Sequence, residues 1–311
     1  MKIIYLFLSL IATCSSPCHV DAQQPLSKVF VQADGAQLFC QTAGAGDPII
    51  VIHGGPGLDQ GYLLPYMAKL AESNFVIFYD QRACGASSGE LTAESINIKT
   101  FLDDIESIRK KFGYKKIIIL GHSWGGFLAM QYAIAHPESV DKLILLSTGP
   151  ASEEERLAFL KELEKRPNPY QQEIKAIKET QKFADGDPTT VEKYYQLSSR
   201  ILCYDPHKAD LLNFRMEAKA FFNGLKVNAL FEENFFKKPY NLYGALKQLN
   251  IPTLVIHGDS DPVPAACAQK IHESIPNSQY ILLKNCGHFP YVEAPEELFK
   301  QLAIFLKTEG K

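Results

Sequence analysis

Residues 117–135 read IIILGHSWGGFLAMQYAIA, an apolar run, a glycine-rich turn and a helical pattern in immediate succession. The run Ile117–Leu120 is short and β-branched, which is typical of a strand buried on both faces. The stretch Phe127–Ala135 favours a helix. The turn between them matches G-x-S-x-G, in which flanking glycines leave room for a serine on a sharp strand-to-helix turn. The pattern therefore predicts that Ser123 is presented at the carboxyl end of a strand.

Similar apolar runs alternate with helical patterns on both sides of this turn, which favours a mostly parallel α/β sheet flanked by helices. The strands predicted to be buried on both faces are Ile49–Ile52, Phe75–Tyr79, Ile117–Leu120, Leu143–Leu146, Thr253–Ile256 and Tyr280–Leu283. Lys28–Gln32 and Gln37–Thr42 are expected to form an opening antiparallel pair. Amphipathic helices are predicted over Phe101–Lys111 and Leu298–Leu306.

The alternation stops between about Gly149 and Tyr240, where strand-like runs disappear. Charged helical patterns such as Glu153–Arg166 and Leu211–Phe222 replace them, so we expect an inserted helical subdomain. The predicted organisation is a leader over 1–22, a first part of the α/β core over 23–148, a helical cap over 149–240 and a second part of the core over 241–311.

The first 22 residues have the order of a secretory signal. Lys2 precedes the apolar run Ile3–Ala12, and a polar stretch then ends in Val20-Asp21-Ala22. Cleavage is predicted after Ala22, which implies a periplasmic or secreted protein, with an uncleaved anchor as the alternative. The apolar run is shorter than the roughly 20 residues needed to span a bilayer, and no other segment approaches that length.

Composition excludes several classes of protein. With 46% apolar and 22% charged residues in 311, the chain has the composition of a globular protein. Its 32 basic and 35 acidic residues give a net charge of −3 without a dense basic tract, so nucleic acid is not an expected partner. The seven cysteines form no C-x-x-C unit, so neither zinc nor a disulfide scaffold is expected. A single bridge between Cys267 and Cys286 is left open.

A serine hydroxyl becomes a good nucleophile only when a base removes its proton, and the partners of such a turn follow in the order acid, then histidine. After the run Thr253–Ile256 comes HGDSDP at 257–262, which places carboxylates where parallel sheets build their sites. Asp261 is the predicted acid, and Asp259 is the alternative.

The predicted base follows the next strand. Residues 285–290 read NCGHFP directly after the Tyr280–Leu283 strand, so His288 would lie on the neighbouring loop. Other histidines are interpreted structurally: His122 is expected to point away from the serine, and His53 and His257 to support their loops.

Backbone amides are expected to stabilise the oxyanion that forms when the serine attacks a carbonyl. Residues 53–57 read HGGPG and follow the strand Ile49–Ile52, where the second half of an oxyanion hole is expected. We assign the amides of Gly55 and Trp124 to this hole and expect Gly54 to contact the substrate.

Three blocks of sequence carry a family resemblance: H-G-G-P-G at 53–57, D-Q-R-A-C-G-A-S at 80–87 and G-H-S-W-G-G at 121–126. With them the chain resembles the α/β-hydrolase superfamily and, within it, the proline iminopeptidases. Ala83 stands where that family usually has glycine, so a slightly altered loop is expected there. The resemblance implies an eight-stranded sheet, a helical cap over the carboxyl ends of its strands, and release of an amino-terminal residue, typically proline, without a metal or organic cofactor.

The resemblance also implies that cap glutamates meet the amine of the substrate, since a buried ammonium needs a carboxylate partner. Glu217, Glu232 and Glu233 are the candidates, and solvated helix positions are the alternative interpretation of each. The aromatic residues around them are expected to form the core of the cap or to line a pocket for a pyrrolidine ring: Phe221, Phe222, Phe231, Phe235 and Phe236.

The leading hypothesis is a serine hydrolase that acts as an aminopeptidase and releases an amino-terminal proline, or another small residue, from short peptides through an acyl-enzyme formed by Ser123, His288 and Asp261. The expected substrate is thus a short peptide or another small molecule. A carboxylic-ester or lactone hydrolase with the same three residues is the second. A non-catalytic ligand-binding protein on the same fold is the third.

Overall fold

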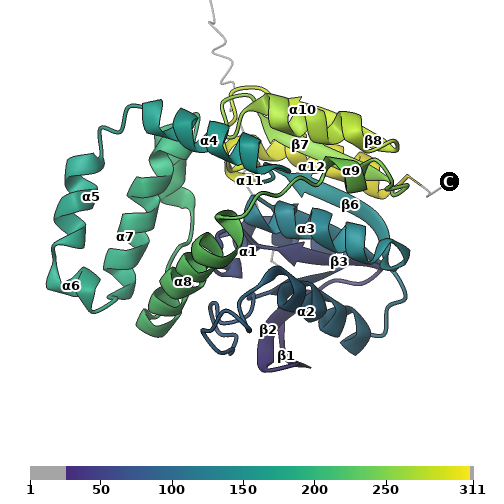
Figure 1. The fold of residues 1–311 in the computed structure, drawn as a ribbon, viewed down its shortest axis with the longest axis horizontal. Coiled ribbons are helices and arrows are strands. Elements are labelled where there is room, and N and C mark those ends of the chain that lie inside the picture. The colour runs from purple at the N-terminus through teal and green to yellow at the C-terminus, as the bar shows by residue number, and fades with distance from the viewer. Residues whose placement is uncertain (1–25, 309–311) are drawn as a thin grey trace, which may run out of the picture.

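An eight-stranded sheet forms the centre of the molecule (Figure 1), in the order β1-β2-β4-β3-β5-β6-β7-β8. The computed structural model describes residues 26–308, so the predicted leader and its cleavage site lie outside it. The strands are β1 Ser27–Ala33, β2 Ala36–Ala43, β3 Asp47–Ile52, β4 Asn74–Tyr79, β5 Ile117–His122, β6 Val140–Leu146, β7 Thr253–Gly258 and β8 Ser278–Leu283. The β1–β2 and β2–β4 pairs are antiparallel and the other pairs are parallel. The predicted fold class is confirmed.

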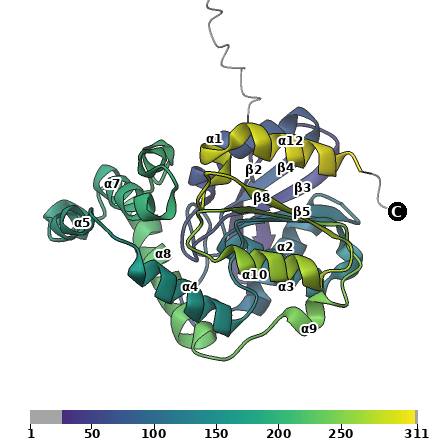
Figure 2. The same cartoon turned by 90° about the horizontal axis from the view of Figure 1, so that it is seen from above.

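Helices cover both faces of this sheet (Figure 2). One face carries α2 Ile98–Lys111, α3 Trp124–Ala135, α9 Tyr243–Leu246 and α10 Ala265–Ser274, and the other carries α1 Leu64–Met67, α11 Pro290–Glu293 and α12 Pro295–Leu306. Successive residues of one strand therefore enter different cores: Ile50 and Ile52 pack on the first face, and Ile49 and Val51 on the second. This arrangement explains why the inner strands are continuous apolar runs rather than alternating ones.

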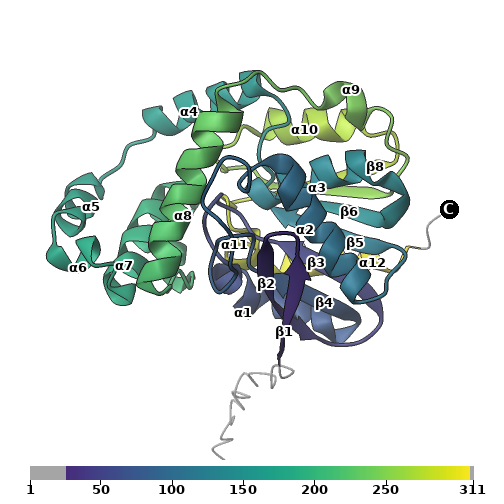
Figure 3. The ribbon, with the colours of Figure 1, turned by 60° about the horizontal axis from the view of Figure 1, so that its bottom comes forward.

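The helical region inserted between β6 and β7 is called the cap here. It comprises α4 Glu153–Lys165, α5 Gln171–Lys178, α6 Gln181–Ala184, α7 Pro188–Ser199, α8 Ala218–Phe231 and a π-helical turn, η6 Glu232–Phe236. Helices α5, α6 and α7 lie away from the sheet, whereas α4 and α8 lie beside it (Figures 1 and 3). Three glutamates occupy the first turn of α4, where negative charge suits the helix dipole.

The prediction of a helix over Leu211–Phe222 is confirmed only from Ala218 onward and is wrong for its first part. A short 3₁₀ helix, Pro206–Leu211, ends there, and α8 begins only at Ala218. In between, Leu212, Phe214 and Met216 are buried and the residues between them are exposed, a period of two that belongs to extended chain. Phe214 stacks on Tyr62 of the core at 5.5 Å between ring centroids, so this extended segment fastens the cap to the core.

Two further expectations concern the described residues. All five of their cysteines are buried and unpaired, so no bridge joins Cys267 and Cys286. None of the helices within residues 26–308 has the length and apolar character required to cross a bilayer.

The carboxyl ends of β3, β5, β7 and β8 lie at one edge of the sheet because these strands run parallel. Each is followed by one of the loops that carry the candidate site residues. The cap lies next to these loops, which places α8 alongside the loop after β3 (Figure 3).

Candidate active site

Ser123 lies between β5 and α3 with backbone angles of φ 56° and ψ −121°. A positive φ is unfavourable for a residue with a side chain and persists only where the surroundings enforce it. The neighbouring glycines show how: a Cβ on Gly121 would lie 2.2 Å from the carbonyl oxygen of Gly125, and one on Gly125 would lie 2.2 Å from that of Ile52. Close backbone packing therefore requires both glycines and holds the serine in its strained turn.

The structure brings Ser123, His288 and Asp261 together. The hydroxyl Oγ of Ser123 lies 2.9 Å from His288 Nε2, to which it donates its proton. His288 Nδ1 donates to Asp261, at 2.9 Å from Oδ2 and 3.0 Å from Oδ1. Burial alone would raise the pKa of Asp261, but the His288 and His257 rings and two hydrogen bonds hold that pKa below its usual value. The carboxylate is thus set to orient the imidazole and stabilise its charged form.

Asp259, the alternative acid, does not approach His288. Its side chain is 25% exposed, accepts a hydrogen bond from the Ser260 hydroxyl at 3.1 Å and lies 3.8 Å from Lys284. Asp261 is instead fully buried and accepts a hydrogen bond from the Val263 amide at 2.9 Å. Of the two carboxylates, the fold therefore turns only Asp261 toward the histidine.

The residues assigned to the oxyanion hole, Gly55 and Trp124, both line the cavity that contains Ser123. Trp124 is the first residue of α3, so its amide has no partner within the helix and can serve an external acceptor. Gly54 does not line this cavity. Its amide donates to the buried hydroxyl of Tyr62 at 2.6 Å, so the structure places Gly54 behind the site rather than against a substrate.

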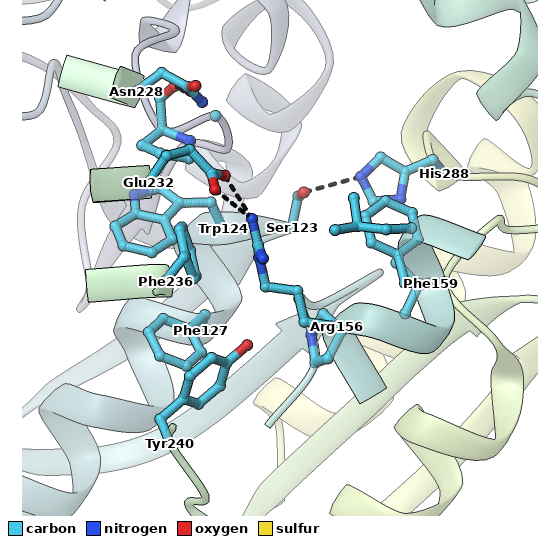
Figure 4. Close-up of a pocket in the computed structure, with 16 residues that line it drawn as sticks. Ser123, Trp124, Phe127, Arg156, Phe159, Asn228, Glu232, Phe236, Tyr240 and His288 are labelled. Atoms are coloured by element: carbon cyan, nitrogen blue, oxygen red, sulfur yellow. Dashed lines mark hydrogen bonds and ion pairs between the residues drawn. The ribbon is translucent and has the colours of Figure 1, made fainter. Parts of the chain in front are cut away.

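The cavity has a volume of about 160 Å³ and lies between the core and the cap (Figure 4). The core contributes Ser123, Trp124 and His288 to its walls. The cap contributes side chains from α4, α8 and the segment after α8: Arg156, Phe159, Leu160, Asn228, Glu232, Phe236 and Tyr240. Apolar cavities of roughly 150 Å³ bind benzene, so this space suits a single small ring.

Comparison with known proteins gives the family. Residues 47–295 match the sequence family described as alpha/beta hydrolase fold. The chain belongs to this family. It is 27% identical to a proline iminopeptidase of Saccharolobus solfataricus over 277 residues, which is 85% of this chain and 86% of that relative.

Two of the solved structures that share the fold of this α/β hydrolase carry different names. The proline iminopeptidase of Mycobacterium smegmatis superposes with a TM-score of 0.67 at 22% identity, over 90% of this chain and 97% of that one. An esterase from Rhodococcus sp. ECU1013 superposes with a TM-score of 0.68 at 21% identity, over 91% and 98%. The same architecture thus occurs in a protein named as a peptidase and in one named as an esterase.

The three candidate glutamates of the cap occupy different places in this hydrolase. Glu217 lies exposed just before α8, Glu233 is exposed, and neither lines the cavity. Glu232 does line it, and both of its carboxylate oxygens lie 2.6 Å from Nη2 of Arg156 (Figure 4). Only Glu232 is therefore placed to meet a group bound beside Ser123.

Arg156 was missed by sequence reasoning. It follows three glutamates in the first turn of α4, a run that looks like a solvated helix start, yet its side chain is only 14% exposed, against 47% for Glu232. Its guanidinium lies 4.2 Å from the centroid of the Phe236 ring. The only available signal was a single basic residue at the end of an acidic run, which does not reveal a partner 76 residues away.

The D-Q-R block has a structural role that the sequence alone did not show. Gln81 donates to the backbone oxygen of His53 at 2.6 Å and accepts from the Trp124 indole at 3.0 Å. It therefore joins the two segments that carry Gly55 and Trp124, the residues assigned to the oxyanion hole. Ala83 has φ 60°, so the chain keeps the left-handed backbone that a glycine would favour.

Within residues 26–308, no group of three or more His, Cys, Asp or Glu side chains is arranged to hold a metal ion.

Proposed function

We propose that this α/β hydrolase is a serine aminopeptidase that releases an amino-terminal proline, or another small residue, from short peptides through an acyl-enzyme. The observation that carries the proposal is Glu232, a carboxylate on the wall of the small cavity that also contains Ser123 and His288. The proline iminopeptidases among its relatives support the same substrate class.

The geometry supports acyl transfer as follows. Ser123 Oγ attacks the carbonyl carbon while His288 Nε2 takes its proton, and Asp261 stabilises the imidazolium. The carbonyl oxygen becomes negative and accepts hydrogen bonds from the Gly55 and Trp124 amides. The C–N bond then breaks as His288 returns the proton to the leaving amine. Water, activated by the same histidine, hydrolyses the ester to the free amino acid and Ser123.

Size and charge select the acyl group. A pyrrolidine ring is smaller than the benzene that cavities of roughly this volume hold. The nitrogen of its secondary ammonium and the carbonyl carbon are bonded to the same Cα atom. The ammonium therefore enters the cavity with the acyl group and needs a hydrogen-bond acceptor there. Each oxygen of Glu232 retains acceptor capacity after binding Arg156, because a carboxylate oxygen accepts about two hydrogen bonds.

One observation favours the second candidate function, a carboxylic-ester or lactone hydrolase. Arg156 and Glu232 together contribute no net charge to the cavity wall, and the rest of the cap side is mainly aromatic and aliphatic. Such a wall also accepts an uncharged acyl group.

A pair of matched substrates separates these functions. L-Prolyl arylamide carries the ammonium, whereas an aryl ester of cyclopentanecarboxylic acid has a ring of the same size without it. We expect Glu232→Gln to lower kcat/KM for the prolyl substrate about 10- to 100-fold, since a hydrogen bond to a charged group contributes about 1.5–3 kcal/mol. The ester should be hydrolysed within about twofold of the wild-type rate.

Glu233→Gln is the control, because it makes the same change one residue away on an exposed side chain outside the cavity. Wild-type protein that hydrolyses the ester but not the prolyl arylamide would support the ester hydrolase. Protein that turns over neither substrate and does not react with a fluorophosphonate would support the non-catalytic binding protein.

We also propose that the protein is exported and cleaved after Ala22, on the strength of the leader pattern in residues 1–22. Amino-terminal sequencing of the protein recovered outside the cytoplasm tests this. A mature chain that starts at Gln23 is the expected result, and an intact Met1 on exported protein would contradict it.

A further inference from the structure

We infer that Tyr62 and His122 are positioning residues that fix the oxyanion-hole loop and the catalytic histidine relative to one another. They form a buried hydrogen-bonded connection, called here the Tyr62–His122 link. The inference rests on the proposed serine chemistry but not on which acyl group the cavity selects.

Three contacts make up the link. The Gly54 amide donates to the Tyr62 hydroxyl at 2.6 Å, and that hydroxyl lies 2.8 Å from Nδ1 of His122. Nε2 of His122 lies 2.8 Å from the backbone oxygen of His288. Tyr62 and His122 are each 1% exposed, so water does not compete for these hydrogen bonds.

The chemistry of the groups fixes where each proton lies. A backbone amide only donates, so the Tyr62 oxygen accepts from Gly54 and its single proton goes to Nδ1 of His122. Nδ1 is then the acceptor nitrogen, Nε2 carries the hydrogen, and Nε2 donates to the backbone oxygen of His288. Burial lowers the pKa of His122 to about 3, in agreement with a neutral ring.

The neutrality of this ring matters for the reaction. The His122 and His288 ring centroids are 5.0 Å apart, and His288 becomes positively charged when it takes the proton of Ser123. A charged His122 would repel that imidazolium at close range. The proton from Tyr62 satisfies the one free nitrogen of His122 and so keeps the ring neutral and in one orientation.

The link reaches all three parts of the active site. Gly54 adjoins Gly55, His122 adjoins Ser123, and the third contact is the backbone of His288 itself. The fit is close, because a Cβ on Gly54 would lie 2.7 Å from the Tyr62 hydroxyl and 3.1 Å from Cβ of Ser123. A shift of about 1 Å at such a site can lower the rate about 100-fold.

A purely structural role for Tyr62 is the competing explanation, since its ring packs against Phe214, Phe289 and Tyr291. The same cluster provides a matched control. Tyr291 is also fully buried and its ring lies 5.5 Å from that of His122, but its hydroxyl has no hydrogen-bond partner within the described part of the chain. Removing this hydroxyl keeps the packing and breaks no link.

The experiment compares Tyr62→Phe with Tyr291→Phe in the full mature protein, using a simple aryl ester and the rate of inactivation by a fluorophosphonate. For Tyr62→Phe we expect kcat and the inactivation rate to fall about 10- to 100-fold while KM stays within about twofold. For Tyr291→Phe we expect both rates within about twofold of wild type. Equal rates in the two variants, or a Tyr62→Phe defect confined to KM, would overturn the inference.

A double-mutant cycle tests whether the two residues act through one connection. His122→Asn keeps an acceptor near Tyr62 but loses the contact to the His288 oxygen. The double variant should be no slower than about the slower single variant, because either change breaks the same link. Fully additive losses would show that the residues act separately. Neither readout requires a prolyl substrate, so failure of the aminopeptidase proposal leaves this test intact.

Discussion

The two walls of the cavity are built differently. On the core side, Ser123, Trp124 and His288 follow the ends of parallel strands, and backbone packing and buried hydrogen bonds fix each of them. On the cap side, Arg156 and Glu232 come from helical segments far apart in the chain, and one ion pair beside the Phe236 ring holds them. In the core wall Trp124 and His288 are buried and Ser123 is half-buried, whereas the side chain of Glu232 is 47% exposed.

We infer from this difference that the core wall carries out the reaction, whereas the cap wall selects the substrate. A reaction that needs five groups held in fixed positions relative to one another is best supported by a rigid sheet edge. A wall made of side chains on a separate layer can change its size and charge without moving the nucleophile. In this hydrolase we therefore expect changes in the core wall to lower the rate with every substrate, and changes in the cap wall to alter the preference among substrates.

The largest expected effect tests whether a change in the core wall lowers the rate with every substrate. Ser123→Ala should lower kcat by at least about 10⁴-fold for the prolyl arylamide and for the cyclopentanecarboxylate ester alike, because both need the same nucleophile. Alanine retains the strained backbone, so Tm should stay close to that of wild type. Residual turnover of only one of the two substrates would contradict the expectation that both depend on Ser123.

An intermediate effect is expected where the walls meet, at Gly224 of α8. A Cβ there would lie 2.0 Å from the backbone oxygen of Gly57, in the loop that carries Gly55. Because backbone cannot yield easily, we expect Gly224→Ala to push α8 away, to destabilise the protein by about 1–3 kcal/mol and to raise KM. Thermal unfolding and steady-state kinetics measure these effects.

Gly244→Ala in α9 is the matched control, since a Cβ at Gly244 meets nothing within 4 Å. It should leave KM unchanged and stabilise the helix slightly, by up to about 1 kcal/mol. If Gly224→Ala behaves in the same way, the cap does not rest on the oxyanion loop as tightly as the structure indicates.

The smallest expected effect is on the pH dependence of stability, to which Asp59 contributes. Burial, with a contribution from the neighbouring Asp80, raises the pKa of Asp59 from 3.8 to about 7. Between these pH values the folded state binds more protons than the unfolded state, so stability falls as pH rises through this window. Asp59→Asn removes this pH-dependent loss of stability. The Tm of the variant minus the Tm of wild type should therefore increase between about pH 5 and pH 7 and stay constant at higher pH. A difference in Tm independent of pH would contradict the shifted pKa.

The features that could be predicted from the sequence are those whose conformation is determined by neighbouring residues in the chain. The apolar runs and the glycines around Ser123 carry their own structural constraints, so the strands and the turn were predictable from short stretches. Asp261 was also predicted ahead of Asp259, but the contacts that fix this choice lie outside the local pattern, because the loop turns Asp261 inward to meet the Val263 amide and His288.

The cap was harder to predict because its structure depends on partners distant in the chain. The segment Leu212–Met216 looks helical by composition, but contacts with the core select an extended conformation. Likewise the Arg156–Glu232 pair joins two ordinary charged helix positions, and only the folded chain shows that both face the cavity.

The π-helical turn Glu232–Phe236 gives the cap wall an unusual sensitivity to chain length. Such a turn accommodates one residue more than an α-helical turn does, and both of its end residues, Glu232 and Phe236, line the cavity. Loss of a single residue from it would leave an ordinary α-helical turn of about 3.6 residues and so change the spacing of the acid and the ring along the cavity wall. A one-codon deletion at this place is thus a short evolutionary route to a hydrolase with different substrates and an untouched nucleophile.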